Sequence, residues 1–403
     1  MDRAPTLYTL YDPEVRADPH SFYHHCRSIS PVVRDSIFGH WLVTGYTETA
    51  AGLRDQRLSA KRMLPSDALP PDDVHALRPI VDLSAAQMLF LDPPDHGRVR
   101  SVVAKAFTPK RAEVMRQKIT AIVEELIAPL AEGAELDLVS QVAYPLPAIV
   151  IAEMLGVPAE DRDLFKIWCD DFIRFVGTTA LSGNELLRAA ASASAMTEYF
   201  RDLVTARRLC PHDDLLTDLI RAQDEGRVVS EHEFLANCIL LLTAGHETST
   251  HMLGNAVLAL LEHPAQREIF THEPEGVAAA INELLRYDGP VQFIARTAKE
   301  DLALGDAVIR RDERVLLMLA AANRDPRAFP EPDTLDLRRG GERVLAFGHG
   351  VHVCLGAPLA RLEAEVGLTV LLQRFPHLHK TSTADKWQST ITFRGLAELR
   401  LRA

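Results

Sequence analysis

The stretch that most constrains the fold of this chain is the decapeptide at residues 347–356, Phe-Gly-His-Gly-Val-His-Val-Cys-Leu-Gly. Its glycines permit a positive φ and a close approach of the backbone to a bulky partner. Pro358 and the apolar spacing after it predict a helix directly behind this loop. The N-terminus of such a helix favours the thiolate form of Cys354. A thiolate held in this way suggests axial ligation of haem iron, and the alternative is a tight glycine turn with a structural cysteine.

A second feature is a long predicted helix that begins after Ser230 and stops at Pro264. Ser230 and Glu233 fit a capping box, and the proline ends the periodic apolar pattern. About 32 helical residues would span roughly 48 Å. The middle of this helix, Ala-Gly-His-Glu-Thr at residues 244–248, is polar between apolar flanks. We expect a local distortion or a bound water there, and the alternative is an ordinary polar interruption of a buried helix.

Two charged pairs have helical spacing. His96 and Arg100 lie four residues apart on a helix predicted after Asp92-Pro93-Pro94, so they share one face. Glu283 and Arg286 lie three residues apart on a helix predicted over residues 277–287, where their side chains can meet. Taken alone, the first pair is typical of a solvated basic face and the second of an exposed ion pair of little energetic value.

The rest of the chain alternates helices with short strands. We predict a helix within residues 11–27, with Asp18-Pro19 as a plausible start, and a hairpin of residues 32–33 and 41–43. Residues 60–90 carry four prolines and are predicted to form an irregular, mobile loop. Two helices are predicted in residues 160–208 around a break at 177–183, and a strand over residues 291–296.

In this order, the motifs H-x-x-x-R, A-G-x-E-T, E-x-x-R and F-G-x-G-x-H-x-C-x-G resemble those of the cytochrome P450 superfamily, and the resemblance extends over nearly the whole chain. It implies a mainly α fold with a triangular helical body and a small β-rich region. It also implies haem b, iron protoporphyrin IX, with Cys354 as the metal ligand. The chain is thereby similar to soluble, bacterial-type haem-thiolate monooxygenases.

The resemblance further implies roles for single residues. Glu247 and Thr248 would deliver protons to dioxygen, and Glu283, Arg286 and Arg339 would form a structural set, with Arg338 as the adjacent competitor for the last position. The implied cofactor-binding residues are His96, Arg100, Ala244, Gly245, Arg296, Phe347, Gly348, His352, Cys354 and Gly356. The expected substrate pocket is lined by Leu241, Val291, Phe293 and Ile391 and by parts of residues 60–90 and 165–185.

Composition sets further bounds on the 403 residues. No linker, low-complexity run or repeat divides them, so we predict a single domain over residues 1–403. A net charge of −12 argues against general affinity for nucleic acid or for an anionic membrane. Five widely spaced cysteines favour a reducing compartment over a disulfide framework. With no apolar signal segment and no run of about 18 apolar residues, we expect a cytoplasmic protein without a membrane span, and a monomer.

The resemblance implies insertion of one oxygen atom from O2 into an apolar, medium-to-large organic substrate, by hydroxylation or epoxidation, in bacterial secondary-metabolite (antibiotic) biosynthesis. No flavin or nicotinamide motif is visible, so a separate ferredoxin with its reductase, or a flavodoxin, would supply electrons. Three alternatives remain. A haem-thiolate peroxygenase would use peroxide, a Cys-His hydrolase would use Cys354 as nucleophile, and a non-catalytic protein would only bind haem or apolar ligands.

Overall fold

The computed structural model describes residues 4–61, 71–104, 107–177, 182–225, 229–340 and 343–403. The chain forms two compact units, each assembled from separate stretches of sequence. The first comprises Met1–Ser59, Arg116–Pro145 and Thr248–Ala403, and the second comprises Ala60–Met115 and Leu146–Glu247. This division does not test the prediction of a single domain, which stays a prediction.

The second unit is helical. Its helices are α4 (Pro71–Ala86), α5 (Asp95–Val103), α6 (Pro109–Val114), α8 (Pro145–Met154), α9 (Arg162–Gly177), α10 (Gly183–Leu209), α11 (Leu215–Asp224) and the first half of α12 (Glu231–Glu262), with 3-10 turns at Met88–Phe90 and Ala159–Asp161. The two helices predicted in residues 160–208 are α9 and α10, and they pack against each other. A capping box of Ser182 and Glu185 begins α10.

The prediction of an irregular loop over residues 60–90 is wrong for residues 71–86. These residues form α4, with Pro79 inside it. Proline removes a backbone donor and normally breaks a helix. Here tertiary packing overrides that preference, since Leu77, Ile80 and Leu83 are each at most 3% exposed and α4 packs against α10. Residues 62–70, which carry two of the four prolines, lie outside the described residues.

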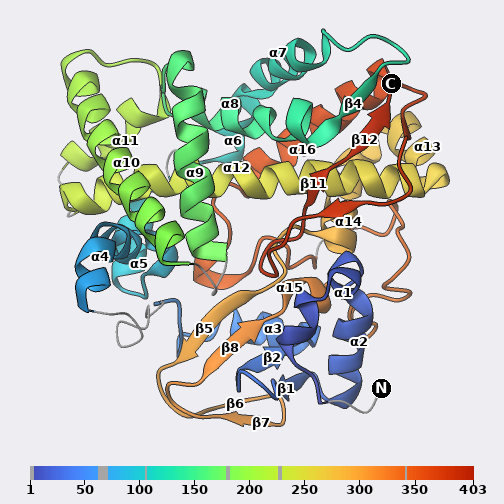
Figure 1. The fold of residues 1–403 in the computed structure, drawn as a ribbon, viewed down its shortest axis with the longest axis horizontal. Helices are drawn as coiled ribbons and strands as arrows, with labels where there is room; N and C mark the ends of the chain where they lie inside the picture. The colour runs from blue at the N-terminus through green and yellow to red at the C-terminus, as the bar shows by residue number, and fades with distance from the viewer. Residues whose placement is uncertain (1–3, 62–70, 105–106, 178–181, 226–228, 341–342) are drawn as a thin grey trace. The chain divides into compact units, whose positions relative to one another are not determined.

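The first unit combines helices with all the strands assigned in the described residues (Figure 1). Its helices are α1 (Pro13–Ala17), α2 (His20–Ile29), α3 (Tyr46–Gly52), α7 (Arg116–Ile127), the second half of α12, α13 (Pro264–His272), α14 (Val277–Asp288), α15 (Leu319–Ala322) and α16 (Ala357–Arg374), with a π-helix at Val139–Ala143 and 3-10 turns at Leu7–Tyr11, Pro274–Gly276 and Gly350–His352. The start predicted at Asp18-Pro19 is confirmed, because α2 begins at His20, and a short helix, α1, precedes it. The residue before a proline disfavours helical backbone, which separates α1 from α2.

Five strands form the main sheet in the order β1-β2-β8-β5-β3. They are β1 (Val32–Arg34), β2 (Trp41–Val43), β3 (Leu58–Ser59), β5 (Ile294–Ala298) and β8 (Arg314–Leu317). The predicted β1–β2 hairpin is confirmed, and β8 joins β2 in parallel with Trp41 opposite Val315. Alternate residues of β8 enter two hydrophobic clusters, Val315 and Leu317 on one face and Leu316 on the other. Burial on both faces explains the continuous apolar run of this strand.

Smaller sheets complete the first unit. They are the pair β6 (Leu302–Leu304) and β7 (Ala307–Ile309), the pair β10 (Lys386–Trp387) and β11 (Leu396–Glu398), and the three strands β4 (Glu135–Asp137), β12 (Arg400–Arg402) and β9 (His379–Lys380). The mainly α fold with a small β content is therefore confirmed. Among the described residues, no helix combines the length and the apolar character needed to cross a membrane.

Candidate active site

The loop that carries Cys354 is closed by its own backbone. The Cys354 amide donates to the Phe347 carbonyl at 2.9 Å, and Gly348 and Gly350 have φ values of 70° and 74°. A Cβ on Gly350 would lie 2.8 Å from the Leu53 carbonyl oxygen, so this position also needs glycine for space. The loop therefore has one well-defined conformation, and its cysteine is exposed.

The helix predicted behind the cysteine is confirmed. α16 begins at Ala357, with Gly356 as its N-cap and Pro358 in its first turn. The N-terminus of α16 carries a partial positive charge close to Cys354 in the chain, and this charge favours the thiolate form of the cysteine. All five cysteines lie in the described part of the chain, and no disulfide joins any two of them. A Cβ on Gly356 would meet nothing within 4 Å, so there is open space at this residue, two positions after the cysteine.

A half-buried arginine, Arg361, adds positive charge near Cys354. The Arg361 guanidinium stacks over the Phe347 ring at 4.4 Å from its centroid, and Nε donates to the Asn282 side chain at 2.9 Å. Burial lowers the pKa of Arg361, and the charge of Cys354 partly opposes this effect. Because the interaction is mutual, Arg361 stabilises the thiolate form of Cys354. The motif comparison did not single out this contact.

Behind the loop lies a buried ion pair. Glu283 and Arg286 of α14 are each 1% exposed, and Arg286 donates from Nε and Nη2 to the two carboxylate oxygens at 2.7 and 2.9 Å. The remaining Arg286 donors reach the carbonyls of Asn323, Pro332 and Thr334, so all five guanidinium N–H groups are used. The alternative of an exposed ion pair is therefore wrong.

The two adjacent arginines have different partners. Arg339 Nε donates to Glu283 at 3.2 Å, whereas Arg338 pairs with Glu273 at the surface. Asn323, whose carbonyl accepts from Arg286, also accepts from the Leu345 amide at 2.8 Å through its side chain. Hydrogen bonds therefore connect the ion pair to the segment that leads into the cysteine loop.

The long helix α12 has the predicted capping box. The Ser230 amide donates to the Glu233 carboxylate at 2.8 Å, and the Glu233 amide donates back to the Ser230 hydroxyl at 3.2 Å. Hydrogen bonds from Arg98 are the main reason that the pKa of Glu233 falls to about 2. Helical structure runs from Glu231 to Glu262 without a break.

The middle of α12 is shared by the two units, since the division falls between Glu247 and Thr248. In the second unit, a Cβ on Gly245 would lie 3.6 Å from Ile151, an ordinary contact, and Ala244 is exposed. In the first unit, Ser249 follows Thr248 and hydrogen-bonds Glu363 of α16. Glu363 is 2% exposed, and burial raises its pKa to about 8. Sequence reasoning did not identify this pair, whose members lie far apart in the chain.

The other predicted site residues also divide between the units. Arg296, on β5 and 8% exposed, and the half-buried His352 belong to the unit of Cys354. His96, 2% exposed, and the half-buried Arg100 lie on α5 in the other unit.

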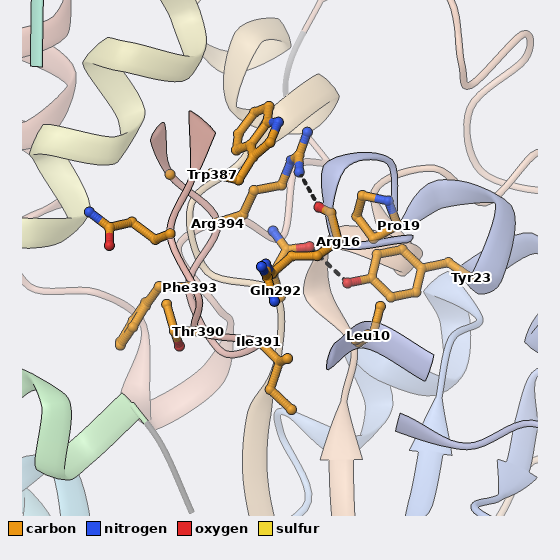
Figure 2. A pocket seen from close by; sticks show the side chains of 12 residues that line it. Leu10, Arg16, Pro19, Tyr23, Gln292, Trp387, Thr390, Ile391, Phe393 and Arg394 are labelled. Atoms are coloured by element: carbon orange, nitrogen blue, oxygen red, sulfur yellow. Dashed lines mark hydrogen bonds between the residues drawn. The ribbon is translucent and has the colours of Figure 1, made fainter. Parts of the chain in front are cut away.

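Three of the four residues expected in the substrate pocket lie in the first unit. Phe293 and Ile391 pack on the same buried cluster, and Val291 forms a β-bridge with Phe393. Leu241 of α12 is buried in the second unit. Figure 2 shows Ile391 at the tip of a C-terminal loop, beside a recess lined by Tyr23, Gln292 and Arg394 among others.

The donor chemistry of the first unit fits a haem group. It offers an exposed cysteine thiol at a helix N-terminus, open space at Gly356, and the cationic Arg296 in the same unit. The cytochrome P450 family model matches residues 75–396 of this chain. The chain is a cytochrome P450. It is thus a monooxygenase of the oxidoreductase class, and its cofactor is haem b.

Bacterial relatives match this cytochrome P450 over nearly its full length. It is 36% identical over 392 residues to the biotin biosynthesis cytochrome P450 of Bacillus subtilis (strain 168), covering 96% of each chain. It is 36% identical to the cytochrome P450 monooxygenase PikC of Streptomyces venezuelae, covering 96% of this chain and 91% of the relative.

A solved structure is similar as well. P450BioI in complex with hexadec-9Z-enoic acid ligated acyl carrier protein superposes with a TM-score of 0.90 at 36% identity, covering 97% of this chain and 100% of that one.

Proposed function

We propose that this cytochrome P450 inserts one oxygen atom from O2 into an apolar, medium-to-large organic substrate, by hydroxylation or epoxidation, in bacterial secondary-metabolite biosynthesis such as that of an antibiotic. The observation that carries the proposal is the exposed thiol of Cys354 just before α16, in a loop where Gly350 has no room for a Cβ. Haem, when bound, supplies the activation of dioxygen. The chain binds and orients the substrate and supplies protons.

The proposed roles follow the chemistry of each side chain. Cys354 would hold the haem iron through its sulfur, which the α16 N-terminus and Arg361 stabilise as thiolate. Arg296, His352, His96 and Arg100 would neutralise the propionates of the cofactor. Phe347, Gly348, Gly356, Ala244 and Gly245 provide its contact surfaces.

Proton supply is assigned to two neighbouring residues of α12. The Thr248 hydroxyl passes protons towards dioxygen, and the Glu247 carboxylate replenishes them. Both proton transfers, from Thr248 and from Glu247, require a site from which bulk water is largely excluded, because free water would let reactive species escape. The apolar flanks of α12, where Leu240, Leu241 and Leu242 are each at most 8% exposed, support this assignment.

The substrate class rests on two lines of support. Phe293 and Ile391 are half-buried apolar side chains packed on one cluster. Relatives of known structure were solved with hexadec-9Z-enoic acid on an acyl carrier protein, with myristic acid, with testosterone and with tirandamycin C. We infer from both that the substrate is apolar and medium to large.

Electrons come from a separate ferredoxin with its reductase, or from a flavodoxin. This proposal rests on the sequence, in which no flavin or nicotinamide motif is visible. A monomeric state and a cytoplasmic location stay predictions.

The first experiment is the absorption spectrum of the reduced, carbon-monoxide-bound protein for wild type, Cys354→Ala and Cys210→Ala. Cys210 is the matched control because it is also an exposed cysteine. A strongly red-shifted thiolate-type Soret band is expected in wild type and Cys210→Ala, and its loss is expected in Cys354→Ala. An imidazole-type band, or no haem in folded wild type, would refute the proposal and favour the Cys-His hydrolase.

The second experiment separates the remaining alternatives. Wild type is given NADPH with a surrogate ferredoxin and reductase, or peroxide alone, together with myristic acid or testosterone as trial substrates. Oxygenated product from the ferredoxin system is expected. Product from peroxide alone would favour the peroxygenase, and binding without product or NADPH consumption would favour a non-catalytic protein.

A further inference from the structure

The loop of residues 388–395 joins β10 to β11 and carries Ile391 and Phe393. We call it the 388–395 loop. Its outer part meets the segment before β5, because the Gln292 amide donates to the Thr392 carbonyl at 2.9 Å and Val291 forms a bridge with Phe393. The loop therefore lies against the same segment that supplies Val291 and Phe293 to the proposed pocket.

The base of the loop is held by Arg394. Its guanidinium donates to Asp288 at 2.6 Å and to the carbonyls of Arg16 and Ala17 at 2.8 and 2.9 Å. It also stacks over Trp387, 3.5 Å from the ring centroid (Figure 2). Planar stacking combined with several directed hydrogen bonds leaves this side chain little freedom.

Helix α12 contacts the base from another direction. Asn255, 2% exposed, donates from its side chain to the carbonyls of Arg394 and Asp288, each at 3.1 Å. His251 lies one turn earlier on the same face and is also 2% exposed. A Cβ on Gly395 would overlap the imidazole of His251, with even Cε1 only 2.5 Å away.

The Gly395 position is therefore limited by packing. Its φ lies outside the left-handed region that favours glycine, so backbone conformation does not demand glycine there. Any side chain must displace either a buried imidazole on α12 or the loop itself. The loop also bonds the segment of residues 291–292, and Ile391 packs on the same cluster as Phe293, so a displacement at its base changes how Ile391 packs beside Phe293.

We propose that His251 and Gly395 together set the position of the 388–395 loop and thereby the shape of the substrate pocket, which makes both of them specificity-determining positions. This inference rests on the proposed function, which assigns Ile391 to the pocket. His251 and Gly395 act through the loop as positioning residues and do not touch the reacting atoms. The occupants they select among are apolar ligands that differ in bulk.

The test uses four haem-loaded variants: Gly395→Ala, His251→Ala, the double variant, and Gly254→Ala as matched control. Gly254 lies on the same helix, and a Cβ there would meet Leu396, the first residue of β11, at an ordinary 3.9 Å. Hydrogen exchange of peptide 386–398 reports the loop without any substrate. Soret titrations with imidazole and with clotrimazole, a small and a bulky azole that both bind haem iron, report the shape of the pocket.

Gly395→Ala is expected to speed exchange in peptide 386–398 and to change the clotrimazole-to-imidazole ratio of Kd at least about fivefold, equivalent to about 1 kcal/mol. The double variant returns both readouts to within about twofold of His251→Ala, because the space for Cβ is then available. Gly254→Ala leaves both unchanged. If Gly395→Ala alone does not fold, the comparison of the double variant with His251→Ala still tests the packing.

If hydrogen exchange in peptide 386–398 of Gly395→Ala is as slow as in wild type, the inference is overturned. Faster exchange with an unchanged Kd ratio would also overturn it, because the loop would then not shape the pocket. Failure of the proposed function is recognised separately, by the absence of the thiolate spectrum in wild type.

Discussion

The buried carboxyl of Glu363 is expected to make a contribution to the stability of this protein that declines with rising pH. Its folded-state pKa of about 8 lies above the ordinary value of 4.5, because burial disfavours the charged form. Between these two values the unfolded chain binds fewer protons than the folded one, so the free energy of unfolding falls as pH rises. We predict that Glu363→Gln, which stays neutral and can still bond Ser249, removes this decline.

The magnitude follows from the two pKa values. With 1.36 kcal/mol per pKa unit, the contribution of this carboxyl changes by about 2 kcal/mol between pH 6 and pH 8. Unfolding entropy is about 2.1 cal/mol/K per residue, or about 0.85 kcal/mol/K for a chain of this length. The Tm of wild type relative to Glu363→Gln should therefore fall by about 2.5 °C over this range.

The assay is thermal unfolding of both haem-loaded proteins at several pH values between 6 and 8. Comparing the two at each pH cancels the titration of all other groups. Glu365→Gln on the same helix is the control for loss of a carboxylate, since Glu365 is partly exposed and pairs with Arg116 at 2.7 Å. A constant Tm difference for Glu363→Gln, or an equal pH dependence for Glu365→Gln, would refute the reasoning.

Three further substitutions test the site. Gly350→Ala should lower the haem content of purified protein, because its Cβ would meet a backbone carbonyl oxygen at 2.8 Å. Gly340→Ala is the control, because Gly340 has a similar φ of 78° but a Cβ there would meet nothing within 4 Å, so this substitution should cost only about 1–2 kcal/mol of backbone strain. Arg286→Met removes both hydrogen bonds from Arg286 to the buried Glu283 carboxylate, which keeps only the longer contact with Arg339 as a charged partner, and should lower the free energy of unfolding by about 3–5 kcal/mol in urea titrations; a loss below about 1 kcal/mol would contradict the burial. Thr248→Ala should divert NADPH consumption from product to hydrogen peroxide. Thr243→Ala, which loses only the hydrogen bonds of its hydroxyl to the carbonyls of Ile239 and Leu240 in the preceding helical turn, should keep the wild-type ratio of product to NADPH.

Local signals in the sequence predicted the local parts of this structure. The capping box at Ser230, the helix after Cys354 and the β1–β2 hairpin each depend on residues a few positions apart, where propensity and spacing decide the outcome. The family motifs also predicted that Glu283 and Arg286 form a structural pair. The spacing of these two residues alone did not indicate that the pair is buried.

What the sequence did not show depends on tertiary contacts. α4 forms around Pro79 because α10 covers its apolar face. Ser249 and Glu363 lie on different helices, and the glycine at position 395 is explained only by the ring of His251. No periodic or local pattern reports such pairs, since each residue alone is compatible with many environments.

The parallel pairing of β2 with β8 has a consequence for biosynthesis. The β1–β2 hairpin leaves the ribosome early, but the strand that covers its edge, with Val315 opposite Trp41, is made only after most of the chain. At about 5–20 residues per second, that edge waits roughly 15–55 s for its partner. During this interval the nascent N-terminal segment exposes an unpaired apolar strand, which makes it a natural binding target for chaperones. A fast-translated gene in a heterologous host shortens this interval, so codon choice between residues 43 and 314 offers a handle on soluble yield that leaves the protein itself unchanged.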